Sequence, residues 1–528
     1  MDRRSFLKTA ALGSVSAGAV SCSQDKNRAG ANAAASRNTP NLLYVFADQY
    51  RLHAMGFWKK PQFRNHLKTE SDPVYTPNID KLAEKGVVFT QATSTNPVCS
   101  PHRAMLMSGM YSSRNGVEGA NCYSGRVQGL RHDVNCFTDA LSQAGYETGY
   151  VGKTHWERTE PLFDDELDYV GTKARPGGTY ANNYDTYIPP GLGRHSNKFW
   201  FQTFNDQHFS QYAYSNRPEL IGGKKDGEMH QTERFSAEVE ADAVIRFLKN
   251  KNGERSPDKP FSMFWSPNPP HNPYFSPDDC EKDIYEKHYK DMPLGEQMYR
   301  KNILPPKPTQ NERFDPKKCT PVYNSLVTGV DRQLGRVLEA LEETGEAENT
   351  IIIFTADHGE MLGSHGVMGK GYYEDESFLV PFIIHYPQAI KPHADDLLLG
   401  TVDIMPSTLG LMGLTDYIPE TVEGVDYSHG IATGDYSKSS KPDAALYLTA
   451  GRKGVRTDQY TYVVYQDGKA EVVDQIQDPY QMNKMSPDQI PQQELAFLKQ
   501  ELGDCLTKAG DDWARDKKFP EHITYPAV

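Results

Sequence analysis

The run Asn41-Leu42-Leu43-Tyr44-Val45-Phe46-Ala47 is almost wholly apolar, and the polar pair Asp48-Gln49 follows it directly. A short, continuous apolar run is typical of a strand whose two faces are both buried. Helical patterns separate this run from four others of similar character: residues 146–152, Phe261–Ser266, 351–356 and 381–386. Such alternation predicts an α/β fold, in which helices sandwich a large mixed, mainly parallel sheet.

The segments between these runs carry helix signals. Thr76 can act as an N-cap and Pro77 fits a first turn, so we expect a helix over residues 78–85 that ends at Gly86. Apolar residues also recur at helical spacing over residues 137–144, 235–248 and 326–341.

Beyond about residue 430 the pattern changes. Strand-like runs at 444–449, 455–466 and 469–474, the last two joined by Asp467-Gly468, predict an antiparallel meander with a type I′ turn. A helix is expected over residues 489–506, with leucines on one face. We therefore expect a main domain over residues 39–430 and a smaller C-terminal α+β subdomain over residues 431–528.

The composition limits the class of partner. The chain has 528 residues, a hydrophobic content of 38% and a formal net charge of −13, which suits a globular enzyme. The negative charge argues against nucleic acid or an anionic membrane as the main partner. It does not exclude an anionic substrate, because a local pocket can be cationic.

The first residues resemble a targeting segment. Arg3-Arg4 followed by small apolar residues predicts a twin-arginine-type export signal over residues 1–22, too short to span a membrane. Cys22 lies in a lipoprotein-like cleavage box, so it either carries a lipid anchor or is removed with the signal. Residues 23–38 are expected to be a linker. We expect a periplasmic protein, either free or held to the membrane through Cys22.

The chain has seven cysteines, without the spacing of a zinc site. Export permits disulfides, and Cys122–Cys136 or Cys280–Cys319 are the pairs that spacing allows. Spacing alone does not decide between paired and free thiols.

Reactive or charged residues follow each of four predicted strands: Asp48-Gln49, Lys153-Thr154-His155, Pro270-His271 and Asp357-His358-Gly359. The carboxyl ends of parallel strands share one edge of a sheet, where open α/β proteins bind ligands. We therefore expect these side chains to form one site. The long irregular stretches 157–233 and 267–320 are expected to wall its cleft.

The segment Asn96-Pro97-Val98-Cys99-Ser100-Pro101-His102-Arg103 lies between the first two strands. We expect Cys99 to Arg103 to open a helix through residues 104–110, whose N-terminus would favour an anion. Asp48, Gln49 and Asp357 offer oxygen donors and His358 a nitrogen, a set that suits calcium or magnesium. The cationic or proton-donating candidates are Arg103, Lys153, His155, His271 and Lys370. Together they fit a tetrahedral oxyanion, either sulfate or phosphate.

Six motifs, in order, resemble those of the type I sulfatases, the formylglycine-dependent family of the alkaline phosphatase superfamily. They cover residues 40 to about 390: Pro40 to Gln49, Cys99 to Arg103, Gly152 to His155, Pro270 to Pro273, Thr355 to Gly359, and His365 to Lys370 with Pro381 to Ile384 behind it. The later segment from Asp478 to Asn483 looks like a feature of the family's C-terminal subdomain.

The resemblance implies a mechanism. A maturation enzyme would oxidise Cys99 to formylglycine, whose hydrate attacks the sulfur and forms a formylglycine sulfate-ester intermediate. One calcium ion would be held by Asp48, Gln49, Asp357, His358 and the modified residue 99. Asp357 would help to activate the attacking hydroxyl, and Arg103 and Lys153 would orient the diol. His271, with Lys370, would protonate the leaving oxygen, and His155 would deprotonate the second hydroxyl.

Two positions depart from the family's commonest pattern. His102 stands where Ser is usual, although Cys99, Pro101 and Arg103 are kept. Gln49 replaces a more frequent aspartate, which removes one negative charge from the metal site. A neutral amide oxygen can still ligate calcium.

Three functions are compatible with these motifs. The leading hypothesis is hydrolysis of sulfate esters on a carbohydrate, which export and the long cleft-forming stretches favour. The first alternative is a phosphoester or phosphonate hydrolase of the same superfamily, since it would share the metal-site logic. The second is a non-catalytic glycan-binding lipoprotein.

Overall fold

The computed structural model describes residues 39–119, 128–157, 185–204 and 207–526. The predicted export signal, Cys22, the linker 23–38 and Cys122 lie outside these ranges. No helix among the described residues is long and apolar enough to cross a bilayer.

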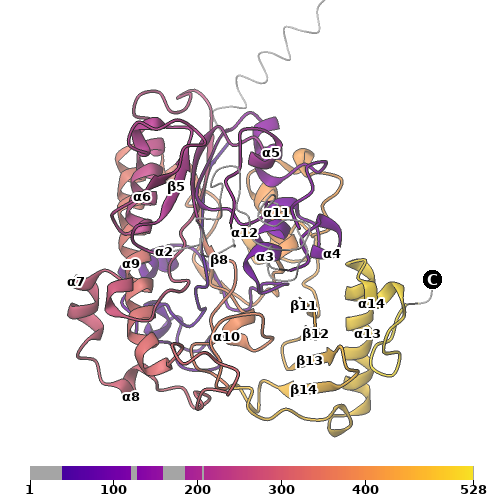
Figure 1. The fold of residues 1–528 in the computed structure, drawn as a ribbon. Coiled ribbons are helices and arrows are strands. Elements are labelled where there is room, and N and C mark those ends of the chain that lie inside the picture. The colour runs from indigo at the N-terminus through magenta and orange to yellow at the C-terminus, as the bar shows by residue number, and fades with distance from the viewer. Residues whose placement is uncertain (1–38, 120–127, 158–184, 205–206, 527–528) are drawn as a thin grey trace, which may run out of the picture. The chain divides into compact units, whose positions relative to one another are not determined.

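A ten-stranded sheet forms the centre of the fold, in the order β10-β2-β9-β8-β1-β7-β3-β4-β5-β6 (Figure 1). The strands are β1 Asn41–Ala47, β2 Val87–Phe89, β3 Glu147–Lys153, β4 Phe199–Thr203, β5 Tyr212–Ser215, β6 His230–Gln231, β7 Phe261–Ser266, β8 Thr350–Ala356, β9 Phe382–His385 and β10 His393–Asp395. Strands β8, β1, β7, β3 and β4 run parallel, whereas β9 joins β8, and β5 joins β4, in antiparallel fashion. The mixed, mainly parallel sheet is as predicted.

Strand β1 lies between β7 and β8, and every one of its residues is buried. Tyr44 is in register with Phe264 on one side and Ile353 on the other, and its ring stacks on that of Phe264 at 5.1 Å. Burial on both faces explains why this strand is a continuous apolar run rather than an alternating one.

Helices cover both faces of the sheet. Helices α2, α6 and α9 lie together on one side and α3, α5 and α11 on the other (Figure 1). The helices are α2 Pro77–Lys85, α3 Cys99–Ser108, α4 Ser112–Asn115, α5 Phe137–Gln143, α6 Ser236–Leu248, α7 Lys282–Ile284, α8 Leu294–Gln297, α9 Pro316–Glu343, α10 Asp375–Phe378, α11 Thr401–Leu411, α12 Ser428–Thr433, α13 Gln492–Lys508 and α14 Asp512–Arg515.

The start of α2 differs from the expected cap. Thr76 precedes the helix, but its hydroxyl donates to Asp80 and caps no backbone N–H. Instead, the carboxylate of Asp331 on α9 accepts the N–H groups of Asn78 and Ile79 at 3.0 and 2.7 Å. The cap therefore comes from a neighbouring helix.

A second sheet of four antiparallel strands lies in the C-terminal part: β11 Ala445–Thr449, β12 Arg452–Arg456, β13 Tyr460–Tyr465 and β14 Ala470–Asp474. Leu498, Leu502 and Leu506 of α13 are buried with it in one core. The prediction of one strand over residues 455–466 was wrong. The Thr457 hydroxyl accepts the N–H groups of Gln459 and Tyr460, and this turn divides the segment into β12 and β13. The domain boundary at residue 430 stays a prediction.

The stretch 157–233 is more regular than its sequence indicates. Its described residues include β4, β5 and β6, which extend the large sheet. Trp200 on β4 is fully buried, as is Trp156, so neither ring is exposed to stack on a ligand.

The described cysteines are all free thiols: Cys99, Cys136, Cys280, Cys319 and Cys505. The pairing Cys280–Cys319 that spacing allows is not formed. The two thiols donate instead to the carbonyl oxygens of Pro277 and Arg313, each at 3.6 Å.

Glu240 on α6 provides a test of core electrostatics. It is fully buried, and burial raises its pKa from 4.5 to about 8. Between these two values the unfolded chain loses a proton that the folded protein keeps, so stability falls as the pH rises through this window. We expect Glu240→Gln to stabilise the protein by a few kcal/mol at pH 8, because it removes this cost, and to have little effect near pH 5. Thermal melts of both proteins at the two pH values measure this. An equal shift in Tm at both would contradict the assignment.

Candidate active site

The carboxyl edge of the parallel strands brings polar residues together. Ala47 is in register with Ala356, so Asp48 and Asp357 follow neighbouring strand ends. Asp48 also forms a bridge with Pro270, which places His271 beside the end of β1. Lys153 is the last residue of β3. Residues from four adjacent strands thus meet at one edge.

Cys99 is the first residue of α3 and is only 3% exposed. Its Sγ lies 3.1 Å from Nε2 of His358 and 3.7 Å from Oδ1 of Asp48. Burial raises the pKa of this thiol, but Lys153, Lys370 and His358 outweigh it and hold the pKa well below its ordinary value. The surroundings of residue 99 therefore favour an anion.

Four ligating groups converge around this thiol, with donor atoms within 4.8 Å of one another: Asp48, Cys99, Asp357 and His358. His358 donates through Nδ1 to the carbonyl oxygen of Gly359 at 2.9 Å, so in the neutral ring Nε2 carries the lone pair. Oδ1 of Asp357 accepts the N–H of Gln49 at 3.0 Å and that of His358 at 2.9 Å. These hydrogen bonds hold the His358 ring and the Asp357 carboxylate in place within the cluster.

Arg103 lies fully buried beneath the two carboxylates. Its Nε donates to Asp357 at 3.0 Å and its Nη2 lies 3.4 Å from Asp48. Its Nη1 donates to the carbonyl oxygen of Lys153 at 2.8 Å and to Oγ of Ser266 at 2.6 Å. The ammonium of Lys153 also donates to Asp48. Every buried charge in this group has a partner, as a low-dielectric site requires.

Lys370 lies in the loop after β8 and donates from Nζ to Oε1 of Gln49 at 2.8 Å. Burial lowers the pKa of Lys370, but Cys99, Asp48 and Asp357 raise it above its ordinary value. This side chain is therefore a fixed cation beside residue 99.

Two histidines, His155 and His271, lie near the thiol of Cys99 and are 5% and 7% exposed. Nδ1 of His271 donates to the carbonyl oxygen of Asn272 at 2.8 Å, which leaves Nε2 for residue 99. Burial and Lys370 lower the pKa of His271.

The structure thus brings all the site residues predicted from sequence to one edge, while their individual roles stay predictions. Sequence reasoning missed Ser266, Tyr274 and Glu360, which hold Arg103 and Gln49. The sequence could have indicated Glu360 as a site residue, because it directly follows Asp357-His358-Gly359. It gives no such indication for Ser266 and Tyr274, because their contacts depend on the order of the strands in the sheet.

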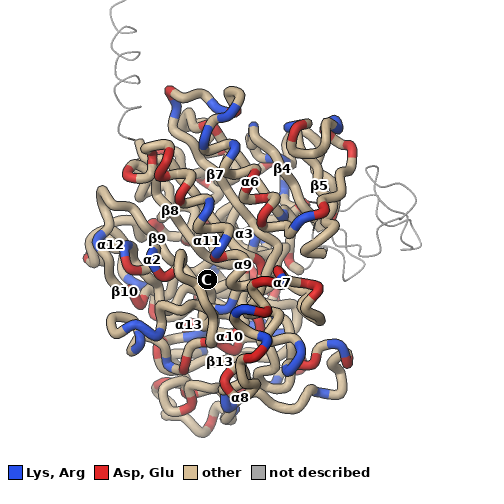
Figure 2. The backbone as a smooth tube through the Cα atoms, turned by 90° about the vertical axis from the view of Figure 1, so that its left-hand side faces the viewer, with Lys and Arg blue, Asp and Glu red and all other residues tan. Residues whose placement is uncertain are grey.

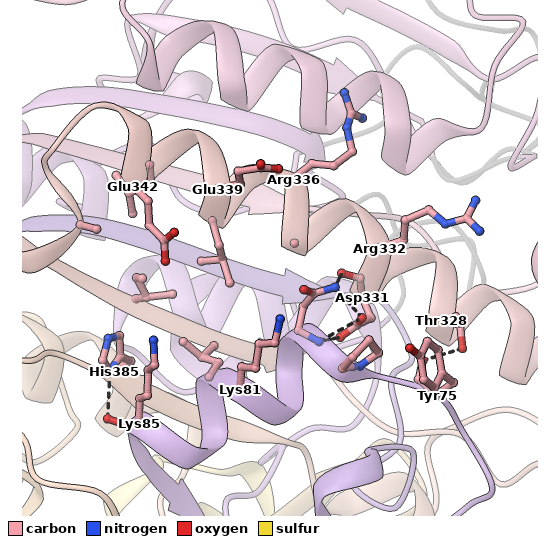
Figure 3. Close-up of a pocket in the computed structure, with 18 of the residues that line it drawn as sticks. Tyr75, Lys81, Lys85, Thr328, Asp331, Arg332, Arg336, Glu339, Glu342 and His385 are labelled. Atoms are coloured by element: carbon pink, nitrogen blue, oxygen red, sulfur yellow. Dashed lines mark hydrogen bonds between the residues drawn. The ribbon is translucent and has the colours of Figure 1, made fainter.

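A separate hollow of about 870 Å³ lies between α2 and α9 and contains none of the predicted site residues (Figure 3). Lys81 and Lys85 line it from α2, opposite Glu339 and Glu342 of α9. In Figure 2, Lys and Arg are interspersed with Asp and Glu along the backbone. Lys287, Arg332 and Arg336 also line the hollow, together with Asp331 and Glu348, so acidic and basic side chains are mixed there.

Comparison with known families identifies a match over most of the chain. A family model described as "Sulfatase" matches residues 40–414. A second, described as "N-sulphoglucosamine sulphohydrolase, C-terminal", matches residues 363–508. The two together include every residue of the cluster around Cys99.

Individual proteins give the same result. An "Endo-4-O-sulfatase" of Bacteroides thetaiotaomicron is 36% identical over 514 residues, 92% of this chain and 95% of that protein. A solved structure from work on glycosaminoglycan metabolism by the same organism has a TM-score of 0.82 at 35% identity and covers 92% of this chain and 100% of its own. The phosphonate monoester hydrolase of Agrobacterium radiobacter has a TM-score of 0.55 at 20% identity, covering 84% and 91%, and shares the fold.

Proposed function

The chain belongs to the sulfatase family and is a sulfuric ester hydrolase, and we propose that it removes sulfate from a sulfated carbohydrate through a formylglycine at position 99, with calcium. A similar protein that matches 92% of the chain is an endo-4-O-sulfatase, which supports a glycan substrate. One observation carries the proposal: Asp48, Asp357 and His358 converge on the side chain of Cys99, which is the first residue of α3.

The donor set fits calcium. Asp48, Asp357 and Gln49 present oxygens, and His358 presents the nitrogen that its bond to Gly359 leaves free. These four residues would hold the ion together with residue 99. When bound, calcium supplies positive charge that polarises the sulfate oxygens.

The nucleophile would come from Cys99. A maturation enzyme would convert the thiol to an aldehyde, and water would add to give two hydroxyls on one carbon. One hydroxyl, deprotonated with the help of Asp357, attacks the sulfur and forms an S–O bond. Arg103 donates to Asp357 and Lys153 donates to Asp48. These two cations would therefore hold the carboxylates in place and orient the diol.

Proton transfer would fall to the two histidines. As the S–O bond to the sugar breaks, His271 donates a proton to the leaving oxygen, and Lys370 stabilises its negative charge. His155 then takes the proton of the second hydroxyl. The electron pair of that O–H bond forms the C=O bond, the sulfate leaves with its oxygen, and the aldehyde is restored.

The substrate class can be tested directly. The purified enzyme is assayed on an aryl sulfate and the matching aryl phosphate, and then on sulfated mono- and polysaccharides by released sulfate. We expect clear preference for sulfate. A preference for phosphate would place the protein with the phosphoester and phosphonate hydrolases, and glycan binding without turnover would make it a binding protein.

Removal of calcium is expected to abolish turnover and to lower Tm, because an ion that binds only the folded state stabilises it by RT ln(1 + [L]/Kd). Activity and thermal melts are measured after treatment with a chelator. Added calcium should restore both quantities, with magnesium as the control ion. An enzyme indifferent to the chelator would contradict the metal assignment.

We also propose export by the segment at residues 1–22 and, for the mature protein, a periplasmic location with a lipid on Cys22. Cell fractionation and the mass of the mature N-terminus test both. A Cys22→Ala variant that stays in the membrane fraction would contradict lipid anchoring.

A further inference from the structure

We infer that Glu360, which none of the roles above uses, is a positioning residue that orients the side-chain amide of Gln49 and the loop that carries Lys370. The inference rests on the proposed calcium site. Glu360 is fully buried and lies three residues after Asp357.

Four hydrogen-bond donors surround this one carboxylate. Oε2 accepts from Nε2 of Gln49 and from the hydroxyl of Tyr274 at 3.0 Å. Oε1 accepts the N–H of Leu362 at 2.8 Å and that of Gly369 at 2.6 Å. Because each partner donates, the carboxylate acts only as an acceptor, which is the behaviour of its ionised form. These four hydrogen bonds thus stabilise the buried carboxylate.

Lys370 and Glu360 together allow the side-chain amide of Gln49 only one orientation. An ammonium can only donate, so the side of the amide that faces Lys370 must be the oxygen. A carboxylate can only accept, so the side that faces Glu360 must be the NH2 group. A flipped amide would set donor against donor and acceptor against acceptor. Glu360 therefore fixes the amide with Oε1 facing Lys370, the cation beside residue 99.

This contact also explains why an amide occupies position 49. An aspartate or glutamate there would bring a second carboxylate against Glu360 in a buried site, where like charges repel strongly. The amide keeps an oxygen facing Lys370, and the negative charge lies on its other side, on Glu360. Gln49 and Glu360 thus act as one unit that supplies one oxygen ligand and one charge.

The other carboxylate oxygen orders the loop that follows β8. Gly369, whose N–H it accepts, immediately precedes Lys370, and the carbonyl oxygen of Gly369 accepts the N–H of Met361 at 2.8 Å. Glu360 therefore connects the proposed metal ligand and the proposed catalytic cation through one group.

The test measures calcium affinity, from the rise of Tm with added calcium, alongside kcat and KM on an aryl sulfate. We expect Glu360→Gln to weaken calcium binding about 10- to 100-fold, as the loss of a partner behind a metal ligand typically does, and to lower kcat more than it changes KM. Gln49→Glu should lose affinity through repulsion. The double variant Gln49→Glu, Glu360→Gln restores a donor–acceptor pair and should recover most of the affinity that either single change loses.

Tyr274→Phe is the matched control, because it removes another donor to the same Oε2 and only a long contact of 3.4 Å with the Gln49 amide, while Glu360 and Lys370 still fix the orientation of that amide. It should cost less than Glu360→Gln. Should Glu360→Gln fail to fold, Gln49→Glu still tests the repulsion, and full calcium affinity in that variant would overturn the inference. Wild-type affinity in Glu360→Gln would overturn it too and leave the proposed function intact. If the wild-type protein shows no rise of Tm with calcium, the calcium part of the proposed function fails and this inference with it.

Discussion

Cys99→Ala is expected to abolish sulfate ester hydrolysis, with a fall in kcat/KM of about five orders of magnitude or more, the scale seen when a covalent nucleophile is removed. The side chain of residue 99 would supply both the attacking oxygen and the group that later expels sulfate. Neither function has a substitute among the cations and histidines around it. Initial rates on an aryl sulfate, with thermal melts to show that the fold persists, measure the loss.

Cys99→Ser is the informative companion to this variant. A serine has one hydroxyl, so it could attack sulfur but would lack the second hydroxyl that expels sulfate. We expect a single turnover at most and a residue 99 peptide heavier by one sulfate. In the wild-type protein the same peptide should have the mass of an aldehyde or its hydrate. A plain thiol in active enzyme, or activity in the alanine variant, would refute the role of Cys99.

His271→Ala is expected to lower kcat by about 10² to 10⁴ on a sugar sulfate, the usual contribution of general acid catalysis. A sugar alkoxide is a poor leaving group and needs a proton as the S–O bond breaks. An activated aryl sulfate releases a stable phenolate, so its hydrolysis should suffer far less. The ratio of the two losses is the measured quantity.

His155→Ala offers a comparison for His271→Ala. Its proposed step follows departure of the sugar, so it should slow both substrates alike and allow the sulfated enzyme to accumulate. Equal losses on both substrates in His271→Ala would remove it as the general acid. Equal losses in His271→Ala together with a larger loss on the sugar sulfate in His155→Ala would reverse the two assignments.

The sequence predicted those parts of the fold that are decided locally. Strands β1 and β7 were predicted at their observed bounds because a strand buried on both faces must be apolar throughout. The three-residue strands β2 and β10 are too short for any periodicity. The division between β12 and β13 depends on the side chain of Thr457, which a β-propensity pattern does not register.

The candidate site divides in the same way. Residues that follow strand ends could be predicted, because topology brings such ends to one edge. The contact between Gln49 and Glu360 could not, since the two are 311 residues apart and meet only when β1 pairs with β8. The same holds for Ser266, whose bond to Arg103 spans 163 residues.

The burial of Cys99 limits when the proposed oxidation of this residue can take place. Residue 99 is 3% exposed, and Ser100, His102 and Arg103 are fully enclosed. An oxidising enzyme that must bind this segment can reach it only before the chain folds around the start of α3. Under the proposed maturation, oxidation competes with folding, and a molecule that folds first stays inactive for good. The active fraction of a preparation is then set during synthesis, and later incubation of folded protein with the maturation enzyme should not raise it.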